Sequence, residues 1–484
     1  MAQEIKNLKP QSVWSYFYDL TQIPRPTGQV KEVCDYLLRI GKEIGVEVQQ
    51  DAVGNVIMRK PASPGYESRK VVTLQSHVDM VPQKNSGTPH DFSKDPIDAY
   101  VDGEWVKAKG TTLGADNGIG VAYALAVMAD KSLVHGPLEA LFTIDEEVGM
   151  VGAFGLQPGF SKGDILLNLD SEEEGNLYIG CAGGIDVGAT LSYEDNQPVP
   201  EGDIAVEIIL NGLKGGHSGV DIHLGRANAN KLMFRFLKKI VEDLGVCVSF
   251  VEGGSLRNAI PRECRAIVTL PEEDADMLWE AVSDYRDLYN REYHGIENEV
   301  RLEAHKCELP KQIVPREIQD NVIHAVEAVQ NGVVTMLHDF PDTVESSSNL
   351  AYLRLGNGEL DVKFLTRSSS DSRKMMVASS IESAFALIGA KVEMSASYSG
   401  WQPNAESYVM DVMRDTYTKM FGEAPGVKVM HAGLECGILQ GVMPDMDMIS
   451  FGPEIRHPHS PDEKVNIPSV ERVYNYLVEA LKAL

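Results

Sequence analysis

An apolar run that ends in three consecutive acids, Leu138-Glu-Ala-Leu-Phe-Thr-Ile-Asp145-Glu146-Glu147-Val-Gly149, organises the rest of this chain. The apolar part is long enough for a buried strand, so the acids follow the carboxyl end of that strand. In an open α/β sheet, ligands bind in the crevice beyond these ends. Three adjacent carboxylates stay ionised there when a cation lies among them, and a divalent metal is the simplest candidate.

Other polar clusters are expected at the same sheet edge, because they follow apolar runs or lie in loops between predicted strands and helices. They are His77 with Asp79, Asp116, Asp170 and His459. Imidazole and carboxylate ligands together suit Zn²⁺, Co²⁺ or Mn²⁺, whereas Ca²⁺ and Mg²⁺ prefer shells of oxygen alone. Two histidines and several carboxylates exceed one tetrahedral site. The sequence therefore predicts two divalent metal ions sharing a carboxylate, with zinc favoured over cobalt or manganese.

The composition is ordinary for a soluble globular protein, and 484 residues exceed what one hydrophobic core usually supports. A net charge of -27 opposes binding to nucleic acid or to an anionic membrane. The six cysteines form no CxxC pair, which favours reduced thiols. The first residues lack the apolar segment of a secretion signal, and no later window is long enough to span a membrane. We therefore expect a cytoplasmic protein without nucleic-acid or membrane partners.

Strands alternate with helices at both ends of the chain, which indicates a largely parallel α/β sheet. The predicted fold is a catalytic α/β domain with a mostly parallel sheet, formed by residues 1–185 and 396–484. An inserted α+β lid domain, residues 186–395, interrupts it. Two consecutive cycles of strands and helices in the lid suggest a ferredoxin-like unit that is duplicated. Between two of the lid strands, the polar run Ser346-Ser-Ser-Asn349 predicts a loop.

Six short stretches contain the residues able to do chemistry: Ser76-His77-Val-Asp79-Met-Val81, Gly114-Ala-Asp116-Asn117-Gly118, Asp145-Glu146-Glu147-Val-Gly149, Leu169-Asp170-Ser-Glu, Gly215-Gly216-His217-Ser218-Gly219 and His457-Pro-His459-Ser. In this order, and over nearly the full chain, they resemble the M20 family of dinuclear metallopeptidases. Within that family the sequence is most similar to the bacterial aminoacyl-histidine dipeptidases. The resemblance implies hydrolysis of dipeptides, Xaa-His and others, by water that two metal ions activate.

The resemblance also implies two ligand sets that share one carboxylate: His77, Asp116 and Asp170 for one ion, and Asp116, Glu147 and His459 for the other. Asp116 would be the bridge. Spacing alone does not separate His459 from His457 as the ligand. We choose His459 because its His-Ser-Pro context aligns best with the family motif.

Two further acids receive catalytic roles by the same resemblance. Glu146 would be the general base, and Asp79 would orient His77. Residues two apart on a strand point to the same face, so Asp79 can reach the free ring nitrogen of His77. The neighbours Glu146 and Glu147 cannot share one direction in regular structure, which lets one face a metal and the other its water.

The lid is expected to supply the groups that contact the substrate. By resemblance, His217 would stabilise the tetrahedral oxyanion, while Asn258 and Arg367 would bind the peptide backbone and the terminal carboxylate. A guanidinium group fits a carboxylate well. Glu435 is a further candidate, for the substrate's ammonium group. We interpret the other histidines as structural: His90, His135, His223, His294, His305, His324, His338 and His431.

The main prediction is a metallodipeptidase whose partner is its dipeptide substrate. An N-acyl amino-acid deacylase or a carboxypeptidase of the same family would share every metal ligand and differ only in pocket residues. A catalytically silent homologue that binds peptides is a third reading, disfavoured because all ligands and Glu146 are present. A two-metal phosphoesterase is disfavoured because no basic cluster accompanies the acids. The sequence leaves open whether the chain forms a homodimer.

Overall fold

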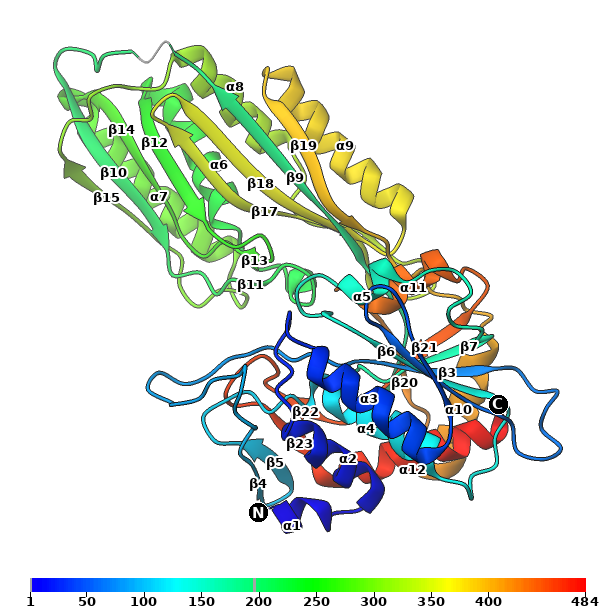
Figure 1. Cartoon of the computed structure of the whole chain (residues 1–484). Coiled ribbons are helices and arrows are strands. Elements are labelled where there is room, and N and C mark those ends of the chain that lie inside the picture. Colours follow the sequence, from blue (N-terminus) through cyan, green and yellow to red (C-terminus); the bar gives the residue numbers. More distant parts are fainter. Residues whose placement is uncertain (1, 195–196) are drawn as a thin grey trace. The chain divides into compact units, whose positions relative to one another are not determined.

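The computed structural model describes residues 2–194 and 197–484, which divide into two compact units (Figure 1). Unit 1 comprises the described residues up to Gly180 together with Pro403–Val429 and Leu434–Leu484. Unit 2 comprises Cys181–Gln402 and the short segment Met430–Gly433. The predicted domain spans differ from these units at residues 181–185, residues 396–402 and Met430–Gly433, which the prediction places in the catalytic domain.

Unit 1 consists of helices on an eight-stranded sheet, with a smaller four-stranded sheet beside it. Its helices are α1 (Ala2–Lys6), α2 (Gln11–Thr21), α3 (Lys31–Ile44), α4 (Ala115–Ala129), α5 (Val151–Gly155), α10 (Tyr408–Phe421), α11 (Glu435–Val442) and α12 (Ile467–Ala483). The large sheet contains β1 (Glu47–Gln50), β2 (Val56–Lys60), β3 (Val72–His77), β6 (Leu138–Thr143), β7 (Ile165–Asn168), β8 (Asn176–Cys181), β20 (Gly426–Met430) and β21 (Asp447–Ser450). The small sheet contains β4 (Ala99–Asp102), β5 (Trp105–Ala108), β22 (Ile455–Arg456) and β23 (Lys464–Asn466).

The large sheet has the strand order β1-β2-β6-β3-β7-β21-β8-β20. The middle strands β6, β3, β7 and β21 run parallel, whereas β1, β2 and β8 pair antiparallel. Every residue of β3, β6 and β7 is buried, as expected for parallel strands covered on both faces. The predicted α/β class is therefore confirmed, and the carboxyl ends of three parallel strands meet at one edge.

Unit 2 is built on a nine-stranded sheet with long helices. Its helices are α6 (Ala229–Leu244), α7 (Ala275–Glu292), α8 (Arg316–Ala328) and α9 (Asp371–Leu387), with short 3-10 turns at Ile222–Leu224 and Glu272–Asp274. Its strands are β9 (Gly183–Ser192), β10 (Asp203–Asn211), β12 (Cys247–Gly254), β14 (Cys264–Pro271), β15 (Arg301–Cys307), β16 (Gly332–Met336), β17 (Val344–Gly356), β18 (Glu359–Ser368) and β19 (Lys391–Tyr398). A separate pair joins β11 (Gly216–His217) to β13 (Ala259–Ile260).

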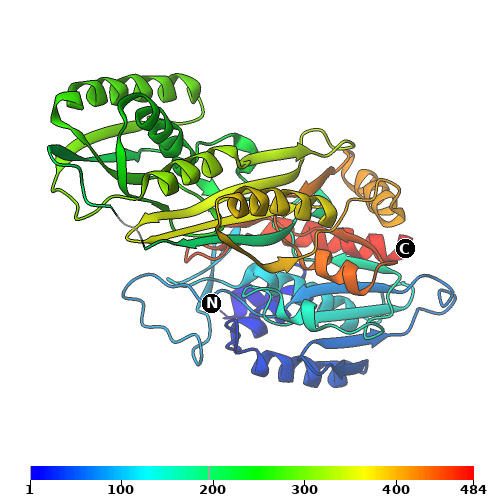
Figure 2. The same ribbon diagram turned by 90° about the horizontal axis from the view of Figure 1, so that it is seen from above.

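The long strands of unit 2 follow the order β15-β10-β14-β12-β17-β18-β9-β19. In the first half, β10-α6-β12-β14-α7-β15 is a ferredoxin-like unit with its strands in the order fourth, first, third, second. The second half, β9-α8-β17-β18-α9-β19, contains the same succession of elements. Its strands lie in the order second, third, first, fourth, which is the order of the first half reversed. Helix α9 lies along the strands of this half in both views (Figure 1 and Figure 2). The two halves meet where β12 pairs antiparallel with β17. The predicted duplication is therefore present.

Two details of the lid prediction were wrong. The halves are not consecutive, because β9 belongs to the second half although it precedes the whole first half in the chain. The run Ser346–Asn349 is not a loop but part of β17. This polar run can be buried in a strand because three of its four side chains find partners within unit 2: Ser346 bonds Ser368 at 2.9 Å, Ser347 bonds His431 at 2.7 Å, and Asn349 donates to the carbonyl of Ala259 at 2.8 Å.

The core of unit 2 is continuous across both halves of its sheet. Phe234 and Phe236 of α6 are fully buried in it. Helix α6 is capped by Asn228, whose side chain accepts hydrogen bonds from the backbone N–H groups of Asn230 and Lys231.

In residues 2–194 and 197–484, none of the helices combines the length and apolar character needed to cross a membrane.

Gly254 offers a test of the seam between the two halves. It lies opposite Tyr352 of β17 at φ 77°, and an added Cβ would meet the carbonyl oxygen of Ala351 at 1.9 Å. We expect Gly254→Ala to lower the free energy of unfolding by about 2 kcal/mol or more. Gly188→Ala in β9 is the control, because its nearest atoms are 4.0 Å away. Urea unfolding measures the free energy of unfolding of both variants. An equal decrease in the two would contradict the conclusion that close packing between β12 and β17 requires a glycine at position 254.

Candidate metal centre and active site

The predicted metal ligands from the parallel strands lie at one sheet edge. His77 is the last residue of β3 and pairs in register with Thr143 of β6, just ahead of Glu146 and Glu147. Asp170 follows the neighbouring strand β7. Because the three strands are parallel and adjacent, their carboxyl ends bring these side chains together.

Asp116 lies between two imidazole rings. It occupies the first turn of α4 with the non-helical backbone angles φ -79° and ψ 111°. Its Oδ1 is 3.1 Å from Nε2 of His77, and its Oδ2 is 3.2 Å from Nε2 of His459. Each carboxylate oxygen therefore faces a different histidine, which is the arrangement that a bridging ligand requires.

Two of the clusters at this edge coincide with the ligand sets implied by the family resemblance: His77, Asp116 and Asp170, and Asp116, Glu147 and His459. The ligand atoms of each cluster lie within 4.8 Å of one another. His459 approaches Glu147 Oε2 to 3.0 Å from the loop between β22 and β23. In the part of the chain that the structure describes, His457 joins none of these clusters and its side chain is exposed.

The carboxylates at this edge carry more negative charge than the neighbouring histidines can balance. Burial is the main cause that raises the pKa of Asp170 to about 6 and that of Glu146 well above its usual value. Hydrogen bonds to Asp116 and Glu147 raise the pKa of His459 to about 11. Glu147 Oε1 is buried and lacks a hydrogen-bond partner among the described residues. Divalent cations would satisfy these carboxylates, so the donor set fits a dinuclear metal site.

Asp79 connects His77 with the acidic turn. Its Oδ1 lies 3.3 Å from Nδ1 of His77, although β3 ends at His77 and Asp79 follows outside the strand, so the regular strand geometry assumed in the prediction is not what brings them together. The same carboxylate accepts the backbone N–H groups of Glu146 at 3.0 Å and Glu147 at 3.2 Å. The hydroxyl of Thr27 donates to it at 2.8 Å. One fully buried carboxylate thus fixes both the ring of His77 and the direction of the two glutamates.

Glu463 supports Asp116 in a way that the sequence did not reveal. Its buried carboxylate accepts the backbone N–H groups of residues 113–116 at distances from 2.7 to 3.2 Å. The buried guanidinium of Arg25 donates to the carbonyls of Val78, Asp79 and Gly114. Together these two buried charges tie the loops of His77, Asp116 and His459 to each other. Nothing in a single sequence separates such charges from solvated loop residues.

His217 of unit 2 is held in one tautomer. Its Nδ1 accepts hydrogen bonds from the backbone N–H groups of Gly219 at 3.1 Å and Val220 at 3.2 Å. Because a backbone N–H can only donate, the ring proton lies on Nε2. Burial, followed by the charge of Arg367, lowers the pKa of His217 to about 4. The residue is therefore a neutral donor at its Nε2 near pH 7.

Arg367 and Asn258 lie near this histidine within unit 2. Arg367 is 5% exposed and donates from Nη1 to the hydroxyl of Tyr398 at 2.9 Å. Asn258 is exposed, and its carbonyl accepts from the backbone N–H of Ser218 at 2.8 Å. The turn of Asn258 is thus bonded to the turn of His217, and the charge of Arg367 acts on the same histidine.

Glu435, the candidate for the substrate's ammonium group, lies within unit 1. It is fully buried in unit 1, where it accepts hydrogen bonds from Gln75 at 2.6 Å and Thr143 at 2.7 Å. Burial raises its pKa to about 7. Its other oxygen, Oε1, is also buried and has no hydrogen-bond partner among the described residues, so a role toward the substrate's ammonium group stays a prediction.

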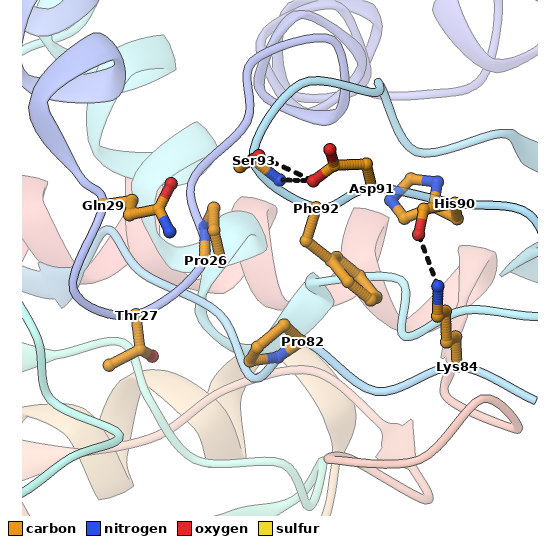
Figure 3. A pocket seen from close by; sticks show the side chains of 9 residues that line it. All are labelled: Pro26, Thr27, Gln29, Pro82, Lys84, His90, Asp91, Phe92 and Ser93. Carbon is orange, nitrogen blue, oxygen red and sulfur yellow. Dashed lines mark hydrogen bonds between the residues drawn. The ribbon is translucent and has the colours of Figure 1, made fainter.

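Unit 1 also contains a pocket of about 570 Å³ beside the Thr27 turn (Figure 3). Its lining residues are Pro26, Thr27, Gln29, Pro82, Lys84, His90, Asp91, Phe92 and Ser93. Lys84 donates to the carbonyl of His90 at 2.6 Å, and Ser93 donates twice to Asp91. These bonds stabilise the wall of the pocket, and none of the predicted site residues lines it.

Comparisons with known proteins extend over the full chain. The model of peptidase family M20/M25/M40 matches residues 73–483. The cytosol non-specific dipeptidase of Escherichia coli (strain K12) is 46% identical over 481 residues, which cover 99% of each chain. The crystal structure of aminoacylhistidine dipeptidase from Vibrio alginolyticus has 46% identity and a TM-score of 0.94, covering 99% of this chain and 98% of that one. The aminopeptidase PepT structure from Bacillus cereus ATCC 10987, at 16% identity and a TM-score of 0.57, covers 98% of this chain and 99% of its own and shares the fold.

The motifs at the sheet edge, their convergence in space and the match over most of the chain agree with one another. This chain belongs to peptidase family M20/M25/M40.

Proposed function

We propose that this protein is a cytoplasmic dipeptidase that hydrolyses Xaa-His and other dipeptides at a dinuclear metal centre. The observation that supports it most strongly is Asp116, whose two oxygens face His77 and His459 next to Glu146. The names of the two relatives at 46% identity, a cytosol non-specific dipeptidase and an aminoacylhistidine dipeptidase, support the substrate class and the location. Their similarity over nearly the full chain favours a dipeptidase over the alternatives named above: an N-acyl amino-acid deacylase, a carboxypeptidase and a catalytically silent homologue that binds peptides.

Two divalent ions, zinc in our proposal, would be held by the two ligand sets and would polarise the scissile carbonyl and acidify water. Glu146 takes the proton from the attacking water and delivers it to the leaving amine. His217 donates a hydrogen bond from Nε2 to the oxyanion as it develops, and its neutral form loses no proton in doing so. Arg367 binds the terminal carboxylate of the dipeptide.

Removal of the metal tests the function directly. Protein stripped with a chelator should lose its dipeptidase activity, because four acids and two histidines would then lack the cations that they are arranged around. Activity on a panel of Xaa-His and other dipeptides should return with Zn²⁺, Co²⁺ or Mn²⁺. Full activity in stripped protein of verified metal content would contradict the dinuclear mechanism.

Glu146→Gln tests the general base. The amide keeps size and polarity but cannot take a proton, so kcat should fall by about 10²–10⁴, or roughly 3–5 kcal/mol of barrier. Metal content should stay near that of the unaltered protein. Glu147→Gln is the matched comparison at the adjacent position, and it should instead lower metal occupancy. If Glu146→Gln lost metal and Glu147→Gln kept it, the two roles would be exchanged.

Arg367→Ala tests recognition of the carboxylate. KM should rise by about 10- to 100-fold for free dipeptides, since a charge-assisted hydrogen bond is lost, and change little for the dipeptide amides. Arg354→Ala on the neighbouring strand β17 is the control, because that side chain is exposed. Steady-state kinetics on both substrate types check this. An equal rise in KM for dipeptides and their amides would assign Arg367 another role.

A further inference from the structure

The segment Met430–Gly433 belongs to unit 2, although the chain on both sides of it belongs to unit 1. Its His431 is 8% exposed, and burial together with the nearby charge of Arg367 lowers its pKa to about 3. His217 and His223 are the other charged or titratable groups that act on it. His431 is therefore neutral near pH 7 and adds no charge that competes with Arg367 for an anion.

The ring of His431 is bonded to the strand opposite Arg367. Its Nε2 lies 2.7 Å from Oγ of Ser347, and Ser347 is 1% exposed. Ser347 of β17 pairs directly with Arg367 of β18 in the antiparallel register. Residues directly opposite on adjacent strands point to the same face, so Ser347 and Arg367 are side-by-side neighbours on that face.

The backbone of His431 packs against the turn that holds His217. A Cβ added to Gly219 would lie 2.3 Å from the carbonyl oxygen of His431. Gly219 is also the residue whose N–H fixes the tautomer of His217. Only a residue without a side chain allows this approach. The backbone of His431 thus packs against the turn that holds His217, and its ring is bonded to β17, the strand next to that of Arg367.

We infer that His431, through Ser347, is a positioning residue that sets the separation between His217 and Arg367 and thereby limits substrates to the length of a dipeptide. The inference rests on the proposed function. In a dipeptide, the scissile carbonyl and the terminal carboxylate are one residue apart, and each further residue adds roughly 3.3–3.6 Å in extended chain. A fixed separation between His217 and Arg367 therefore fits a dipeptide and excludes a peptide that is one residue longer. The contacts of His431 leave it no catalytic role, since its Nε2 is already bonded to Ser347.

The test uses the metal-loaded full chain with three variants and a control. His431→Leu removes the ring nitrogens, Ser347→Ala removes only the hydroxyl, and His431→Gln retains a group that can bond Ser347. His324→Leu, at an exposed histidine of α8, is the control. For each variant, kcat and KM are measured on a dipeptide, its amide and the matching tripeptide, and circular dichroism checks the fold.

We expect His431→Leu and Ser347→Ala each to raise KM for the dipeptide by roughly tenfold, the scale of one lost hydrogen bond, with a smaller effect on kcat. The preference for dipeptide over tripeptide in kcat/KM should fall by a similar factor. The double variant should be no worse than either single one, because both remove the same contact. His431→Gln should recover part of the loss, and His324→Leu should match the unaltered protein.

An unchanged KM and length preference in folded Ser347→Ala would overturn the inference, and so would a fall in kcat alone. Ser347→Ala deletes a single atom, so it decides the matter even where His431→Leu does not fold. Absence of dipeptidase activity in the unaltered, metal-loaded protein would instead refute the proposed function.

Discussion

The shared position of Asp116 between two imidazoles is the constraint on which the rest of unit 1 depends. Its carboxylate can face His77 and His459 at once only if the loop 113–116 is held in place. Glu463 holds it through four backbone N–H groups, and that carboxylate is itself buried with a pKa raised to about 7 by burial. Buried charges of this kind are costly when unpaired. The four N–H groups supply the partners that the buried carboxylate of Glu463 needs.

The histidines of the two units have opposite pKa shifts for physical reasons that suit their proposed tasks. At the sheet edge of unit 1, carboxylates surround His459 and raise its pKa, so a cation can replace the proton there. In unit 2, burial and the charge of Arg367 lower the pKa of His217 and His431. Neutral imidazoles can donate or accept hydrogen bonds without adding charge beside the guanidinium. In our proposal the same type of side chain is thus a metal ligand in one environment and a neutral hydrogen-bond donor in the other.

Unit 2 obtains its rigidity from the pairing of two similar halves. The strands β12 and β17 join them into one sheet, which buries a continuous core. One face of β17 then carries polar residues that hold neighbouring turns in place: Ser347 bonds His431, and Asn349 bonds the turn that contains Asn258, a proposed substrate-binding residue. A strand is a more precise support than a loop, because its neighbours fix its backbone on both sides.

Much of the site was predictable, because short motifs have a local signature. Acids after an apolar run, the placement of His77 and Asp79 two residues apart, and the glycines around His217 each predict chemistry from neighbours in the chain. The α/β class and the duplication of the lid also followed from local periodicity. These features needed no knowledge of which distant residues meet.

Other features were decided by the tertiary structure alone. Ser346–Asn349 reads as a loop, yet it forms a strand because Ser368, His431 and Ala259 satisfy its polar groups. The sequence gives no reason to single out Glu463, and it does not indicate that Glu435 is buried, yet both carboxylates lie in the interior. The chain by itself determined which residues can do chemistry, since that depends on residue type and local spacing. Whether a polar side chain is buried, and what it bonds, depends on contacts between residues far apart in the chain, so only the fold could decide it.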